Sequence, residues 1–75
     1  MEAVALMDGQ LHPFEIKRAA SPDKKAVRAF PLLEKSGKVT GAGGIICMTA
    51  KPFPIDEKNS MIPVNLLLHA LHQLP

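Results

Sequence analysis

The chain has 75 residues, about half the length of a typical domain, which excludes a two-domain enzyme and leaves one small domain over residues 1–75. So short a chain buries only about 60% of the surface that its unfolded form exposes. Yet 47% of its residues are hydrophobic and its net charge is +2, a hydrophobic share that is usual in larger domains. We therefore expect the core to be completed by a second copy or by a missing partner segment.

Several classes of protein are excluded at once. The single cysteine, Cys47, rules out an intramolecular disulfide framework and a cysteine-rich zinc site, and it fits a reducing, cytoplasmic setting. The start of the chain is acidic and its apolar run is short, unlike a signal peptide. No stretch approaches the ~18 apolar residues of a membrane span, so we expect no membrane association.

The charge is unevenly distributed along the chain. Residues 17–38 hold seven basic and two acidic residues, a net charge of +5, whereas the rest of the chain has a net charge of −3. A basic segment on an otherwise acidic chain is either a phosphate-binding surface or an ordinary solvated helix face. The residues of this segment that could contact nucleic acid are Arg18, Lys24, Lys25 and Arg28.

The first elements form a hairpin. Ala3 to Met7 is an apolar run typical of a strand, and Asp8-Gly9 is a strong signal for a two-residue turn. Leu11 to Arg18 then predicts the return strand, in which Glu15 and Lys17 point to one face and Phe14 and Ile16 to the other. Pro13 has no N–H, so we expect this part of the strand to lie at an edge or a bulge.

A helix follows the hairpin. In Ser21-Pro22-Asp23, the hydroxyl can cap free N–H groups, the proline suits the first helical position and the carboxylate faces the positive end of the helix dipole. We expect a kink or a restart at Pro31, because proline in a helix interior costs about 3 kcal/mol. Gly37 ends the helix.

The remaining chain predicts two strands and a second helix. Gly41 to Gly44 is expected to be a flexible loop, and the apolar run Ile45 to Thr49 a strand buried on both faces. Met61 to Val64 is a short edge strand, and Asn65 caps a helix with an apolar stripe. The stripe consists of Leu67, Leu71 and Leu74. The order is β-β-α-β-β-α, an α/β fold in which a small mixed sheet carries the main helix on one face.

Glu15 and Lys17 form the strongest chemical candidate. On one strand they lie on the same face, about 7 Å apart at their Cα atoms. A carboxylate is a hard ligand for Mg²⁺, and a nearby lysine can offset the charge of an attacked phosphate. With Asp8 or Glu2 as a second carboxylate, this would be the minimal site of a metal-dependent nuclease. The alternative is an exposed ion pair on a strand.

Two other groups are assigned no chemistry. His69 and His72 lie at i and i+3 on the last helix, but no third ligand follows from the sequence, so we read them as a solvated polar edge. Cys47 lies in an apolar strand and is expected to be a small buried side chain, because a reactive thiolate needs a polar, positive setting.

Several collinear segments resemble one bacterial and archaeal family. These segments are Leu11 to Lys17, Ala20-Ser21-Pro22, Leu33-Glu34-Lys35, Gly41 to Cys47 and Ile62-Pro63-Val64. They are similar to the C-terminal end of predicted ATP-binding proteins in which an AAA+ ATPase domain precedes a domain of unknown function. That domain resembles the restriction-endonuclease fold. The family pattern Pro-x-Glu-x-Lys is matched by Pro13, Glu15 and Lys17.

The resemblance implies a partial restriction-endonuclease-like core, a fragment of a larger family domain. The ATPase region is absent, and Gly37 to Gly44 contains no P-loop. Ala3 stands where the family carries a metal-binding aspartate. We therefore expect a non-catalytic interaction or assembly module without a cofactor, and a homodimer. The alternative is a nuclease or nucleic-acid-binding domain that uses Glu15 and Lys17 with Mg²⁺ or Mn²⁺. A protein partner is compatible with both, and nucleic acid is not favoured.

Overall fold

A computed structural model describes residues 3–73, except for the side chain of Leu71. Its elements follow in the order β1 (Ala3–Met7), β2 (Gln10–Ile16), η1 (Lys24–Ser36), β3 (Val39–Thr40), β4 (Gly43–Cys47), β5 (Phe53–Pro54), β6 (Asn59–Pro63) and α1 (Val64–His72). The α/β class and the small mixed sheet are as predicted. The short strands β3 and β5 are additions to the predicted order.

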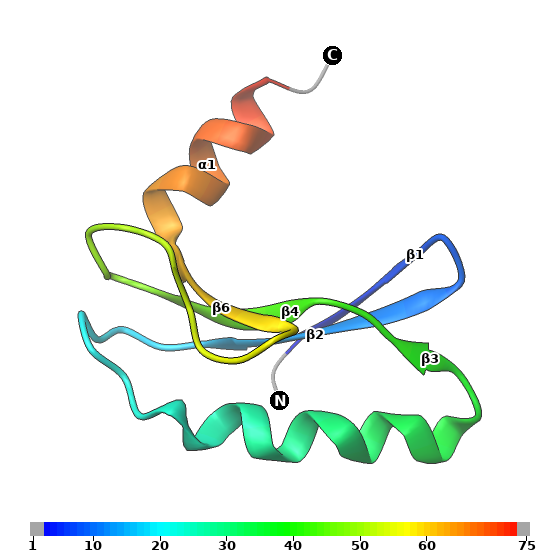
Figure 1. Cartoon of the computed structure of the whole chain (residues 1–75). Coiled ribbons are helices and arrows are strands. Elements are labelled where there is room, and N and C mark those ends of the chain that lie inside the picture. Colours follow the sequence, from blue (N-terminus) through cyan, green and yellow to red (C-terminus); the bar gives the residue numbers. More distant parts are fainter. Residues whose placement is uncertain (1–2, 74–75) are drawn as a thin grey trace.

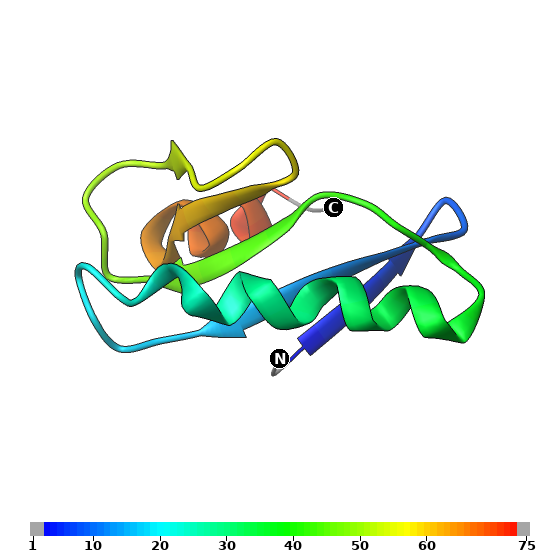
Figure 2. The ribbon, with the colours of Figure 1, turned by 60° about the horizontal axis from the view of Figure 1, so that its bottom comes forward.

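The strands form one mixed sheet in the order β1-β2-β4-β6-β5. The short strand β3 pairs with the first two residues of β2, and β4 pairs with the last three. The two outer pairs, β1 with β2 and β5 with β6, are antiparallel, and the inner pairs are parallel. Figures 1 and 2 show η1 lying along one face of this sheet and α1 rising from the opposite face. The helix that covers the sheet is therefore η1 alone.

The predicted hairpin is confirmed in detail. Met7 pairs with Gln10 across the turn, and Asp8 and Gly9 have φ angles of 51° and 77°, the positive values that a type I′ turn requires. The strand β2 is internal, so the expectation that Pro13 marks an edge is wrong. Pro13 is instead placed where the parallel pairing of β2 is interrupted: the last pair with β3 is Leu11 and Thr40, and the first pair with β4 is Phe14 and Gly44. No parallel partner there needs its missing N–H.

The helix η1 begins later than the sequence suggests. Asp23, not Ser21, is its N-cap, with a side chain that accepts a hydrogen bond of 2.8 Å from the backbone N–H of Lys25. Gly37 ends the helix as predicted, at φ 85°, and donates to the carbonyl of Glu34. No break occurs at Pro31, since η1 continues as a 3-10 helix from Lys24 to Ser36. Pro31 has no N–H to donate to the carbonyl three residues back, so the helix continues with one bond of its ladder missing.

The core lies between η1 and the sheet. Val27 and Phe30 from η1 pack on Ile45 and Cys47 of β4 and on Met61 of β6. Ile45 and Met61 are paired across neighbouring strands and are at most 1% exposed. The predicted burial of β4 on both faces is only half correct, because Ile46, on the other face, is half-buried.

The segment Gly41 to Gly44 was expected to be a flexible loop, and this expectation is wrong for its second half, since only Gly41 and Ala42 lie outside a strand. Gly43 and Gly44 are buried residues of β4. A Cβ atom on Gly43 would collide with the carbonyl oxygen of Pro13, and one on Gly44 with that of Ser60. The glycines let the neighbouring strands approach closely, a role that a strand glycine often has.

The last strand and the last helix are joined without a loop. β6 ends at Pro63 and α1 begins at Val64, so Asn65 lies inside the first turn and is not the predicted cap. The edge position expected for Pro63 is correct locally. Within residues 3–73, β5 pairs only with Ser60 and Met61, and the one strand beside Pro63 is β4.

Candidate functional site

Glu15 of β2 and Lys17, the residue after the strand end, lie on the same side of the sheet, as the alternation predicts. The Nζ atom of Lys17 is 3.3 Å from the Oε1 atom of Glu15. The polarity of the strand is nevertheless the reverse of a usual amphipathic strand. Glu15 is on the face that η1 covers and is 7% exposed, whereas Ile16, on the other face, is 51% exposed. The carboxylate is thus held at the border of the core, with its cation at the rim.

A shallow depression surrounds this pair where β2 meets the start of η1. It is lined by Glu15, Lys17, Asp23, Lys25, Ala26 and Ala29. The sequence places Asp23 only at the helix start, so its position beside Glu15 was not predicted. The carboxylate of Asp23 caps η1 and lies 3.9 Å from the Nζ atom of Lys25. The depression therefore holds two carboxylates and two ammonium groups, and its formal charge is balanced.

The other proposed metal ligands do not join Glu15. Asp8 lies in the hairpin turn, at the opposite end of β2, and the five residue steps from Gln10 to Glu15 span roughly 17 Å of extended strand. Ala3 pairs with Phe14 and shares its face, so its position is not on the Glu15 side of the sheet. Glu2 lies outside the described residues. Within residues 3–73 no group of three His, Cys, Asp or Glu side chains is arranged to hold a metal ion.

The four basic candidates are separated into different surroundings. Arg18 follows β2, and Lys24, Lys25 and Arg28 are exposed residues of η1. Lys25 is paired with Asp23, and the Nζ atom of Lys24 lies 5.8 Å from the centre of the Phe53 ring, within the range of a cation–π interaction. Half of these basic side chains are thus engaged by the protein's own groups.

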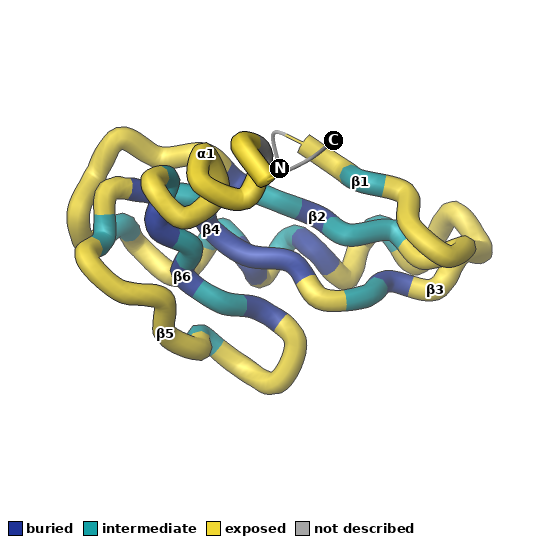
Figure 3. Tube along the Cα trace, turned by 90° about the horizontal axis from the view of Figure 1, so that it is seen from above, coloured by how far each residue is buried: buried dark blue, intermediate teal, exposed yellow. Residues whose placement is uncertain are grey.

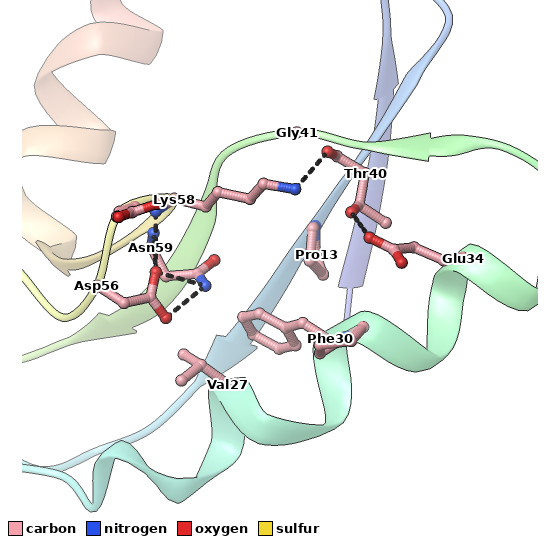
Figure 4. A pocket seen from close by; sticks show the side chains of 11 residues that line it. Pro13, Val27, Phe30, Glu34, Thr40, Gly41, Asp56, Lys58 and Asn59 are labelled. Atoms are coloured by element: carbon pink, nitrogen blue, oxygen red, sulfur yellow. Dashed lines mark hydrogen bonds between the residues drawn. The ribbon is translucent and has the colours of Figure 1, made fainter.

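A second concavity, of about 320 Å³, opens between η1 and the loop that precedes β6 (Figure 4). Its floor is apolar, formed by Pro13, Val27 and Phe30. At its mouth, the Thr40 hydroxyl donates to Oε1 of Glu34 over 3.1 Å, and Nζ of Lys58 donates to the carbonyl of Thr40 over 3.4 Å. These bonds tie η1, β3 and the loop together around the opening.

The loop before β6 is organised by Asp56. Its carboxylate accepts hydrogen bonds from the side-chain amide of Asn59 and from the backbone N–H groups of Lys58 and Asn59, at 2.8–3.1 Å. These hydrogen bonds hold the pKa of Asp56 below its ordinary value. The bond from the Asn59 side chain has the largest effect, and the bond from the Lys58 N–H comes next. Glu34 and Lys58 are thus hydrogen-bonded to Thr40 of β3, and Asp56 is bonded within its own loop, which gives these three groups a structural role.

The sheet face that η1 leaves open is uncharged. We call it the uncharged face and define it by the strand positions whose side chains point away from η1. They are Ala3, Ala5, Met7, Gln10, His12, Phe14, Ile16, Val39, Gly44, Ile46, Pro54, Ser60 and Ile62. No Asp, Glu, Lys or Arg stands at these positions, whereas the opposite side carries Glu15, Lys17 and all the charges of η1. Figure 3 views the sheet from the side of α1 and shows α1 and most of β1 exposed, while β4 is mostly buried and β6 alternates between buried and half-buried residues.

The helix α1 is also largely apolar and exposed to solvent. Leu66, Leu67 and Leu68 are 50%, 37% and 52% exposed. Of the predicted apolar stripe, Leu67 is thus exposed in the single chain. The side chain of Leu71 and the whole of Leu74 lie outside the described part. His69 and His72 are exposed, in keeping with a polar edge.

No protein-family model, curated protein or solved structure matches the chain. Within the described residues, no helix is long and apolar enough to cross a membrane.

Proposed function

We propose that the chain is a non-catalytic interaction or assembly module, a remnant of a nuclease-like domain that works in the cytoplasm without a cofactor. The observation that carries the proposal is the uncharged face. It lies beside three consecutive exposed leucines of α1, while the charges of the described chain lie on the other side of the sheet, around the hairpin turn and in the loops. On this face Ala3, Met7 and Ile16 are exposed, and Phe14, Ile46 and Ile62 are half-buried. Apolar surface that stays partly open to solvent over several neighbouring strands marks an interaction site in a soluble protein. The nuclease-like origin is supported by the resemblance around Pro13, Glu15 and Lys17.

The energetic gain from covering this surface is substantial for so small a chain. Complete burial of a leucine or isoleucine side chain contributes about 1.5–3 kcal/mol. Ile16, Leu66 and Leu68 are each about half exposed, so burying the remainder of each adds about 1 kcal/mol. A domain of this size has only a few kcal/mol of stability of its own, so an apolar partner would change its stability markedly.

Binding of the fluorescent dye anilinonaphthalene sulfonate, combined with the mass in solution, tests the proposal. A working interaction face is either open, and binds the dye, or covered by protein in an assembly. If the wild type binds the dye, Ile16→Glu should abolish dye binding. If the wild type is assembled, Ile16→Glu should reduce the mass in solution to that of one chain. Leu32→Glu is the matched control, because Leu32 is 58% exposed but lies on η1. A wild-type chain that is monomeric and binds no dye would contradict the proposal.

The second candidate is a metal-dependent nuclease or nucleic-acid-binding domain. It is favoured by one observation, the shared depression of Glu15, Lys17 and Asp23. Lys17 and Lys25 already balance the two carboxylates there, so we expect weak attraction for Mg²⁺ or Mn²⁺ and no cleavage. Cleavage of single- or double-stranded DNA or RNA in Mn²⁺ that is lost in Glu15→Gln would favour this candidate instead.

A further inference from the structure

The connection between β6 and α1 prevents the helix from covering its own sheet. A helix that packs on the sheet of its own chain usually follows its strand through a loop of two to six residues. Here Pro63 is the last residue of β6 and Val64 the first of α1, so the helix leaves in the direction that the strand end sets. Figure 1 shows α1 rising away from the sheet, and β6, from which it emerges, is its principal contact.

The side chains of α1 nevertheless require burial. At 100° per residue, Asn65, His69 and His72 fall within one stripe about 60° wide. The positions around the rest of the circumference are apolar, with Leu66, Leu67 and Leu68 in three different directions. A helix that is apolar on nearly all sides belongs in a protein interior. One of nine residues is also too short to be stable alone in water.

The surface area of the chain indicates how large the missing contact is. A folded monomer of 8.1 kDa is expected to expose about 4,500 Å², whereas this chain exposes 5394 Å². The excess, roughly 900 Å², is close to the ~800 Å² that each partner contributes to a standard protein–protein interface. One partner of ordinary size would therefore account for it.

We propose that this partner is a second copy of the chain, and that each copy lays its α1 on the uncharged face of the other. This inference rests on the proposed function and adds the identity of the partner. The chain itself carries both halves of the contact, a sheet face without a helix and a helix without a sheet. A twofold axis pairs each with its complement, so one patch per copy closes the assembly.

The charges of the described residues agree with this arrangement. The uncharged face and α1 carry no Asp, Glu, Lys or Arg within residues 3–73, so their contact buries no carboxylate or ammonium group, a burial that is costly unless well compensated. The two histidines of α1 lie in its narrow polar stripe and stay at the rim. Lys24, Lys25 and Arg28 remain on the outer side of each η1, away from the contact.

Sedimentation equilibrium of the full chain at micromolar concentration, together with dye binding, tests the proposal. We expect a mass twice the chain mass of 8.1 kDa, and no dye fluorescence. Leu68→Glu should halve the mass and expose the uncharged face to the dye, because Leu68 is solvent-exposed within one chain and its change leaves the core intact. Leu32→Glu, an equally exposed leucine on η1, should keep the dimer.

The outcomes separate this inference from the function on which it rests. A wild-type mass equal to that of one chain, with dye binding that Ile16→Glu removes, would overturn the second copy as partner and leave the interaction face standing. The mass of one chain without dye binding would overturn both. A dimer that Leu68→Glu leaves intact would overturn the helix exchange, and circular dichroism would confirm that the variant is folded.

Discussion

Pro63 and Val64 are neighbours in the chain, yet the first closes β6 and the second opens α1. The absence of a loop between them separates α1 from the face that its leucines would otherwise cover. Helix and sheet in one chain are thus complementary surfaces held apart by their connection. The length of this connection should therefore decide whether the chain is a dimer or a monomer.

A flexible insertion between Pro63 and Val64 should turn a dimer into a monomer. With six added Gly and Ser residues, α1 can return to the uncharged face of its own chain, which avoids the entropic cost of association. We expect the sedimentation mass to fall from that of two chains to that of one. The same insertion after Lys51, in an exposed loop, should keep the dimer. If both insertions leave the mass unchanged, the connection does not control assembly.

Removal of the N-cap should weaken η1 at Asp23 and not at Ser21. The Asp23 carboxylate accepts the Lys25 N–H at 2.8 Å, so Asp23→Ala should lower the free energy of unfolding by about 1 kcal/mol. Ser21→Ala should change it by less than ~0.5 kcal/mol, as a surface substitution does. Urea titration of both variants measures the two values. A larger loss in Ser21→Ala would place the cap where the sequence first suggested.

A methyl group at Gly43 should be far more damaging than one at a glycine in a turn. The added Cβ meets the carbonyl oxygen of Pro13 in the neighbouring strand, so Gly43→Ala should lower the free energy of unfolding by about 3 kcal/mol. In Gly9→Ala nothing lies within 4 Å of the new Cβ atom, and only the positive φ costs about 1–2 kcal/mol. Equal losses in the two variants would show that β2 and β4 are not in close contact there.

The contribution of Asp56 should disappear in acid. Its hydrogen bonds from Asn59 and Lys58 hold the pKa of Asp56 below its ordinary value of 3.8. A carboxyl group with a lowered pKa stabilises the folded state above its ordinary pKa, and this stabilisation is lost as the pH falls through the lowered value. Wild type should therefore exceed Asp56→Ala in stability at pH 7 and 5, and the difference should shrink below about pH 4. Thermal unfolding at these pH values measures it, and a difference constant down to pH 2 would contradict the assignment.

The parts of the fold that depend on local sequence were predictable. Asp8-Gly9 needs positive φ whatever surrounds it, so the hairpin follows from two residues. The common face of Glu15 and Lys17 follows from the alternation of a strand. Gly37 likewise ends η1 because few other residues adopt its left-handed conformation.

The parts that depend on distant neighbours were not. Which face of β2 is covered depends on where η1 lies, so the burial of Glu15 beside an exposed Ile16 could not be deduced from polarity. Gly43 and Gly44 read as a loop because only the positions of Pro13 and Ser60 reveal the close approach of the strands. The position of Asp23 in the depression depends on where η1 starts relative to the end of β2. The local signals for the start of η1 are Pro22 and the acidic Asp23 that follows it, and neither says where that start lies relative to β2.

The most direct measurement of the helix exchange is a cross-link between α1 and the uncharged face. The double variant Ile16→Cys/Leu68→Cys places two reactive thiols at exposed positions, while the native Cys47 is 1% exposed and protected. After treatment with a flexible bismaleimide, we expect a product with the mass of two chains on a denaturing gel. A cross-linked product with the mass of one chain would mean that α1 meets its own sheet, and would contradict the helix exchange.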